Sequence, residues 1–109
     1  MDNKIIDFIS NLPGAGDLSS EIESLLSQMK SETTSVFNMQ AERMEKYMLQ
    51  LANDEITAAD LERYIKHIQT IVEMRKTKAS AAIKRKGKEY AEKIGALILK
   101  KLVFLVLAL

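Results

Sequence analysis

The 109-residue chain contains no cysteine and no tryptophan, and it has only one proline and one histidine. Without cysteine, disulfides and thiolate metal sites are excluded, and the redox compartment stays undetermined. Three tyrosines and three phenylalanines supply little aromatic surface for stacking on nucleic-acid bases. The single proline is Pro13, so no proline interrupts a helix in the rest of the chain. With 47% hydrophobic and 28% charged residues, the composition is that of one small helical domain.

Residues that could carry catalysis are sparse, and no motif brings them together. His67 would share a helical face with Asp60 and Tyr64, but its polar neighbours favour a surface or interface position. The glycine-containing segment 14–16 lacks the lysine and the hydroxyl residue that hold phosphate and metal in a P-loop. We therefore expect a protein that is not an enzyme, with no cofactor, no metal and no small-molecule substrate.

The charge is divided unequally along the chain. Residues 1–73 contain six basic and thirteen acidic side chains, a net charge of −7, whereas residues 74–109 contain ten basic and two acidic ones, a net charge of +8. A division this large indicates a polarised molecule with one part suited to an anionic surface. The first residues lack the basic segment of a secretory signal, so we expect a cytoplasmic or membrane-associated protein.

A short amphipathic helix is predicted at the amino end, over residues 2–12. Its apolar side chains Ile5, Phe8, Ile9 and Leu12 recur at helical spacing, and Asp2 or Asn3 can cap its first turn. Residues 13–18 begin with proline and contain two glycines, which predicts a flexible elbow.

A long second helix is predicted over residues 19–52. Ser20 and Glu23 have the spacing of a capping box at its start. Apolar residues follow in steps of three and four, and one shift near Val36 and Phe37 is interpreted as a coiled-coil stutter. At about 1.5 Å per residue, such a helix is a rod of roughly 45–50 Å.

A third helix is predicted over residues 57–109, after a break at 53–55. Thr57 and Asp60 form its capping signal, and a short break between two long helices predicts an antiparallel hairpin. Along this helix the pattern positions alternate between intervals of four and three residues as far as Lys86, and after Lys86 the intervals are four. The expected fold is thus all-α, a single domain over residues 1–109, in which a short N-terminal helix precedes a long antiparallel helical hairpin with an apolar C-terminal helical tail.

A basic stretch over residues 75–88 contains no acidic residue. It could bind nucleic acid through phosphate contacts or attract anionic lipid headgroups. It could also pair with Glu21, Glu23 and Glu32, which lie opposite it in the predicted hairpin. The predicted anionic-surface contacts are Arg75, Lys76, Lys78, Lys84, Arg85, Lys86 and Lys88.

The apolar tail, residues 94–109, has fourteen uncharged residues among sixteen. As a helix it would span roughly 24 Å, which is short of the roughly 30 Å core of a bilayer, and Lys100 and Lys101 lie within it. A two-helix hairpin offers little surface to cover it, so we expect burial in an assembly, a lipid interface or another protein. The predicted contacts are Ile94, Leu97, Ile98, Leu99, Leu102, Val103, Phe104, Leu105, Val106, Leu107 and Leu109.

The sequence therefore predicts a non-enzymatic structural or assembly protein, of the kind found in virions, secretion apparatus or membrane-active systems. Its basic stretch and apolar tail would be buried in a homo-oligomeric assembly or an anionic membrane. The alternative is an accessory protein that binds nucleic acid through residues 75–88. The two hypotheses differ in whether function depends on the tail or on the basic stretch.

Overall fold

The computed structural model describes residues 1–74 and 77–109, in which every regular element is a helix, so the predicted all-α class is confirmed. Helices α5, η1 and α6 follow one another without a break and form one rod. The described part measures 41 × 23 × 22 Å along its principal axes. The elements are α1 (Asn3–Ser10), α2 (Leu18–Lys30), α3 (Ser35–Ala52), α4 (Ala58–Glu73), α5 (Ala81–Ile94), the π-helix η1 (Gly95–Val103) and α6 (Phe104–Leu107).

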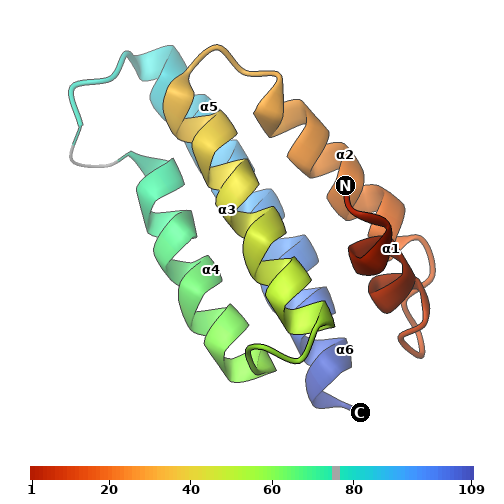
Figure 1. Cartoon of the computed structure of the whole chain (residues 1–109). Helices are drawn as coiled ribbons and strands as arrows, with labels where there is room; N and C mark the ends of the chain where they lie inside the picture. Colours follow the sequence, from red (N-terminus) through yellow and green to blue (C-terminus); the bar gives the residue numbers. More distant parts are fainter. Residues whose placement is uncertain (75–76) are drawn as a thin grey trace.

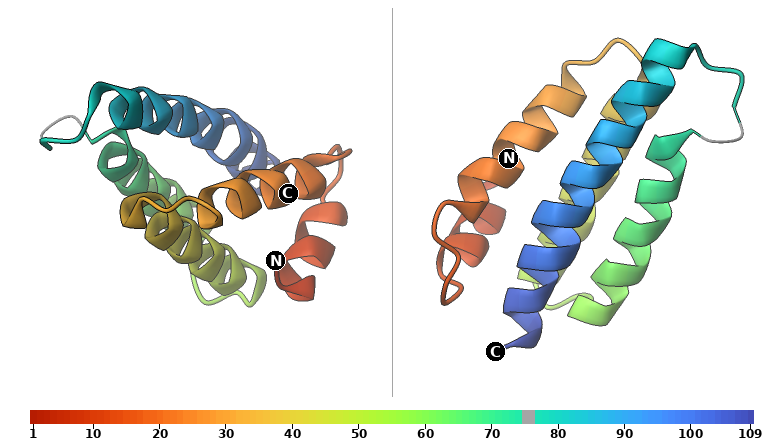
Figure 2. Two further views of the ribbon diagram at one scale, coloured as in Figure 1. Left: turned by 90° about the horizontal axis from the view of Figure 1, so that it is seen from above. Right: turned by 180° about the vertical axis from the view of Figure 1, so that it is seen from behind.

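Four rods lie side by side and alternate in direction (Figures 1 and 2). Helix α2 runs toward one end of the molecule, α3 returns, α4 runs up again, and the rod from α5 to α6 returns, while short α1 packs against α2 and α3. We call the end that holds α6 and segments 11–17 and 53–57 the tip end. The far end holds segments 31–34 and 77–80 and the first turn of α5.

Local capping signals account for two helix starts. The Asp2 side chain accepts a hydrogen bond from the Lys4 backbone N–H at 2.8 Å, which confirms one of the two predicted caps of the first helix. Thr57 and Asp60 form the predicted reciprocal capping box, each backbone N–H lying 3.1 Å from the other's side-chain oxygen. A hydroxyl and a carboxylate three residues apart satisfy donors that a helix start leaves unpaired, so these features depend on nearby residues alone.

The predicted capping box at Ser20 and Glu23 is wrong. Helix α2 begins earlier, at Leu18, with Asp17 at the capping position, so both residues lie inside the helix. Leu18 is almost fully buried, and extending the helix to include it places another apolar side chain in the core.

The prediction of an unbroken helix over residues 19–52 is also wrong, because α2 ends at Lys30 and α3 starts at Ser35. Thr34 has an extended backbone, and the Asn38 side-chain amide donates to the Glu32 carbonyl at 3.1 Å. Serine and threonine side chains compete with helical hydrogen bonds, which favours a break in segment 31–34. The shift of the apolar pattern near Phe37 therefore marks a reversal of the chain, not a stutter.

The predicted helix over residues 57–109 is divided as well. Helix α4 ends at Glu73, Met74 adopts a left-handed backbone with φ of 55°, and Ser80 caps α5 by accepting from the Ile83 N–H at 3.2 Å. Residues 77–80 thus belong to a connection, and the small and basic residues that follow them form the first turns of α5. The long two-helix hairpin is replaced by shorter helices that surround a shared core.

The apolar stripes read from the sequence do form that core. Phe37, Met44, Ile65 and Ile68 are among its fully buried side chains. Stripes from α1, α2, α3, α4, α5 and η1 contribute to one cluster. Its large members include Ile5, Ile9, Ile22, Leu26, Met29, Phe37, Met44, Met48, Leu61, Ile65, Ile68, Val72, Tyr90, Ile94, Ile98 and Leu102.

The last rod contains a π-helix where the apolar residues are spaced by four. In an α-helix, steps of four drift around the axis, because one turn takes 3.6 residues. The wider turns of η1 oppose that drift, and Ile94, Ile98 and Leu102 all remain fully buried. Four residues before η1 begins, the Gln69 side-chain amide donates to the Ala91 carbonyl at 2.8 Å, which links α4 to the last turn of α5.

Candidate functional site

The first half of the predicted contact tail lies inside the protein's own core. Ile94, Ile98, Leu102 and Val103 are at most 3% exposed. The expectation that the chain cannot cover these residues itself is therefore wrong for this half of the tail. The breaks at segment 31–34 and after Glu73 explain the difference, because they fold the chain into enough neighbouring helices to surround the last rod.

The second half of the tail is exposed. Phe104, Leu107 and Leu109 are 66%, 63% and 74% exposed, whereas Leu105 and Val106 are partly buried against the core. We call residues 104–109 the apolar tip. Leu97 and Leu99, further back in η1, are also only partly buried. The tip thus concentrates exposed apolar side chains at one end of the bundle, which is an arrangement found at interaction surfaces.

Acidic residues lie on the two loops at the same end of the bundle as the apolar tip (Figure 1). Asp17 lies in the elbow, directly before α2, and Asp54 and Glu55 lie in the turn between α3 and α4; all three are exposed. Segments 11–17 and 53–57 contain no lysine or arginine. Sequence reasoning missed these carboxylates, because they lie far from residue 104 along the chain and no motif links them to it.

The nearest lysines lie one turn behind the tip. Lys101 forms an ion pair with Glu21 at 3.7 Å, which partly offsets its charge, and Lys100 is exposed. A hollow of about 220 Å³ lies beside them and is lined partly by Phe104 and Gly14. The tip end therefore combines an exposed apolar centre, acidic loops and a small recess.

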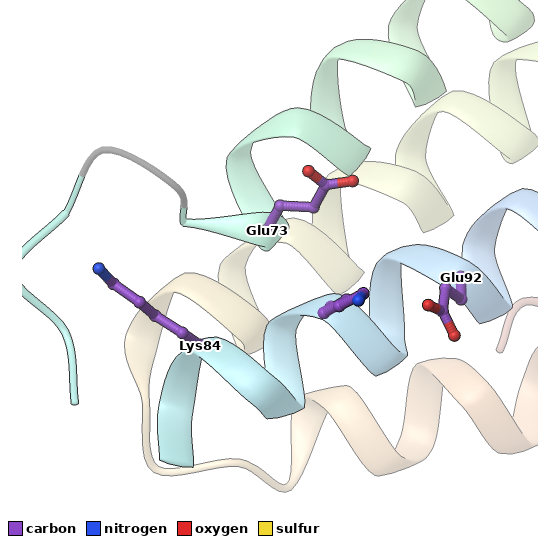
Figure 3. A pocket seen from close by; sticks show the side chains of 4 residues that line it. Glu73, Lys84 and Glu92 are labelled. Carbon is purple, nitrogen blue, oxygen red and sulfur yellow. The ribbon is translucent and has the colours of Figure 1, made fainter. Parts of the chain in front are cut away.

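The basic stretch lies elsewhere. Lys78, Arg85, Lys86 and Lys88 are exposed and Lys84 is half-buried, all on the α4–α5 connection or the first turns of α5. Arg75 and Lys76 lie outside the described residues. In Figure 3 the Lys84 side chain extends toward the connection between α4 and α5. Lys84 and Lys88 line an open groove of about 460 Å³ together with two carboxylates, Glu73 and Glu92.

One predicted pairing of the basic stretch does form. Lys86 Nζ lies 3.1 Å from Glu32 Oε1, which links α5 to segment 31–34. Glu21 instead pairs with Lys101, and Glu23 lies 3.9 Å from the amino group of Met1.

Glu32 is held by a second contact, because the Tyr90 hydroxyl donates to its other carboxylate oxygen. That hydrogen bond, together with Lys86, lowers the pKa of the Glu32 carboxyl from its ordinary value. Burial and the neighbouring Glu32 charge raise the pKa of Tyr90 above its ordinary value. The Tyr90 ring packs edge-on against Phe37 with centroids 5.1 Å apart. Through these contacts Glu32 links the α2–α3 connection to Tyr90 and Lys86 on α5.

The first turns of α5, which hold Lys84 and Arg85, and the apolar tip lie at opposite ends of the same rod (Figure 1). Twenty residues separate Lys84 from Phe104, which corresponds to roughly 30 Å along a helix. A single flat surface at the tip end therefore would not contact the first turns of α5.

Other candidate centres are weaker. His67 is exposed on α4. Within residues 1–74 and 77–109, no three histidine or acidic side chains are grouped so that they could hold a metal ion. Among the same residues, no helix is both long and apolar enough to cross a membrane.

No protein-family model, curated protein or solved structure matches this chain.

Proposed function

We propose that this chain is a non-enzymatic assembly protein that associates with further copies of itself through the apolar tip. The observation that carries the proposal is the exposure of Phe104, Leu107 and Leu109 together at one end of the bundle. Burying a leucine or phenylalanine side chain contributes about 1.5–3 kcal/mol, so covering the tip is favourable. Only residues 104–109, not the whole tail, supply this contact.

Charge at the tip end favours a protein partner over an anionic membrane. Asp17, Asp54 and Glu55 would approach the same surface as Phe104, and an anionic lipid layer would repel them. The lysines near the tip that would attract such lipids are Lys100 and Lys101, and Lys101 is paired with Glu21.

Binding of nucleic acid by the basic stretch is the second candidate. Its support is the exposure of Arg85 and Lys88 on one helix. Against it, Lys86 is paired with Glu32, and the groove beside Lys88 also contains Glu92. Phosphate contacts there would have to compete with these carboxylates, so we favour assembly.

The test is the molar mass of the full chain in solution across a wide range of concentrations. We expect the mass to rise with concentration, and we expect the double variant Phe104→Ser, Leu107→Ser to remain monomeric. Tyr64→Ser is the control for loss of an aromatic side chain at the middle of α4, away from both ends; because the Tyr64 ring packs against Tyr47, circular dichroism checks that this variant is folded. It should associate like the unmodified chain.

A chain that is monomeric at every concentration would overturn the proposal. Flotation with anionic and with neutral vesicles should leave the protein in the unbound fraction. Flotation that is lost in the Phe104→Ser, Leu107→Ser variant would assign the tip to lipid instead.

A further inference from the structure

We infer that the copies pack head to tail, with the apolar tip and its acidic loops of one molecule against the basic far end of the next. This inference rests on the proposed self-association and names its geometry. The observation that carries it is the separation of charge between the two ends of the bundle, which neither the net charge of +1 nor the order of residues along the chain reveals.

At the tip end, most of the charges that a partner would meet are acidic, and the exposed Lys100, one turn behind the tip, adds a positive one. Asp17, Asp54 and Glu55 are all exposed, and they lie on loops that reach the same end as α6 (Figure 1). Lys101 forms an ion pair with Glu21 on α2. A surface that covers the tip would therefore gain from positive charge around its edge.

At the far end, basic side chains outnumber acidic ones among the described residues; the carboxylates there are Glu32 and Glu73, and Glu73 lines a groove together with Lys84. Lys78 and Arg85 are exposed and Lys84 is half-buried, and the carboxylate of Glu32 on the adjacent connection is bound to Lys86 and Tyr90. The same region offers a small apolar area. Ala81 and Ala82 are exposed in the first turn of α5, and Ile83 is half-buried. The far end thus offers both positive charge and a small apolar area, which are the two properties that a partner of the tip end needs.

The symmetric alternative is a tip-to-tip dimer. It would bring two copies of Asp17, Asp54 and Glu55 toward one another around a small apolar contact. Like charges placed opposite each other weaken an interface, and this one offers no basic residue in either loop to offset them. Head-to-tail packing opposes unlike charges instead. A head-to-tail dimer still has one free tip end and one free far end, so further copies can add to it.

Two variants that each block one end distinguish these geometries. The tip variant is Phe104→Ser, Leu107→Ser, and the far-end variant is Lys84→Glu, Arg85→Glu. In head-to-tail packing each variant alone should be monomeric, with self-association weakened at least about tenfold. A mixture of the two should form a dimer with one copy of each, because the intact far end of one variant can bind the intact tip of the other.

The control for charge is Arg43→Glu, Lys46→Glu, which makes the same change in net charge on exposed residues of α3. It should associate like the unmodified chain. Added salt should weaken the mixed dimer, because salt screens exposed charges beyond about 8–10 Å.

A far-end variant that associates as well as the unmodified chain would overturn head-to-tail packing while leaving self-association through the tip intact. Failure of the mixture to form a dimer, with each variant folded by circular dichroism, would also overturn it. A monomeric unmodified chain would instead remove the proposed function on which this geometry rests.

Discussion

Gly87 on α5 faces the backbone carbonyl of Val72 on α4 so closely that a Cβ atom at position 87 would lie 2.3 Å from that oxygen. Real Cβ atoms do not approach a carbonyl oxygen this closely, so a side chain here would force α4 and α5 apart. This contact lies next to the connection that reverses the chain after Glu73. It explains why glycine is tolerated in the interior of a helix, where it costs roughly 1 kcal/mol.

Gly87→Ala should therefore destabilise the protein, although alanine is the better helix former. We expect a loss of about 1–3 kcal/mol in the free energy of unfolding, the range for overpacked positions, measured by urea denaturation. Gly95→Ala is the comparison, since its added Cβ would meet the movable Gln69 amide at 2.9 Å. A larger loss at position 95 than at position 87 would contradict the assigned contact.

Ile98→Ala should cost about 2–5 kcal/mol, because Ile98 is fully buried in η1 and its truncation leaves a cavity. Leu107→Ala should leave the stability of the monomer nearly unchanged, because Leu107 is largely exposed in α6. Thermal denaturation of both variants at low concentration compares the two halves of the tail directly. Equal effects would mean that the division between a buried half and an exposed half is wrong.

Glu32 should make stability depend on pH in the acid range. Its pKa in the folded protein is lowered, chiefly by the Tyr90 hydroxyl and also by Lys86, from an ordinary value of 4.5. A group of this kind binds protons more weakly when folded, so its contribution is present above pH 4.5 and is lost as pH falls through the folded pKa. Glu32→Gln should be less stable than the unmodified chain at neutral pH, and that difference should shrink in acid. A difference that stays constant from neutral to acid pH would contradict the effect.

Thr57→Ala should cost about 1 kcal/mol, because the hydroxyl that accepts the Asp60 N–H is lost. Asp60 then keeps its own hydrogen bond from the residue-57 backbone. Thr57→Ser retains a hydroxyl at the same place and serves as the control in the same denaturation series. If both substitutions cost the same, the hydroxyl is not what stabilises the start of α4.

The helix breaks do interrupt the apolar pattern of the sequence, but the pattern alone does not show that the chain reverses there. The shift at Phe37 and the small and basic residues after Met74 both interrupt the apolar pattern, and each marks the start of a new helix direction. Periodicity reports which side of a helix is apolar, but a stutter within one helix and a reversal between two helices shift the pattern alike. The polar segment 31–34, with its serine and two threonines, was the available signal for a reversal.

The steps of four after Lys86 also had a structural meaning that periodicity alone could not supply. They begin in α5, at Tyr90 and Ile94, and continue into η1, in which Ile98 and Leu102 are fully buried. The surface that η1 packs against is supplied by α4, and the Gln69 amide of α4 also donates to the Ala91 carbonyl just before η1. That hydrogen bond joins residues that are 22 positions apart.

By itself the sequence determined the all-helical class, the cap at Thr57, the apolar faces of the helices and the division of charge along the chain, and it left Asp2 and Asn3 as two candidates for the first cap. Each of these depends on residues within a few turns of one another. Only the tertiary structure decided that Ile98 is buried while Phe104 is exposed, and that the acidic loops and the basic stretch lie at opposite ends. Burial and the position of charge depend on which helices become neighbours after each reversal, and that is a property of contacts between distant parts of the chain.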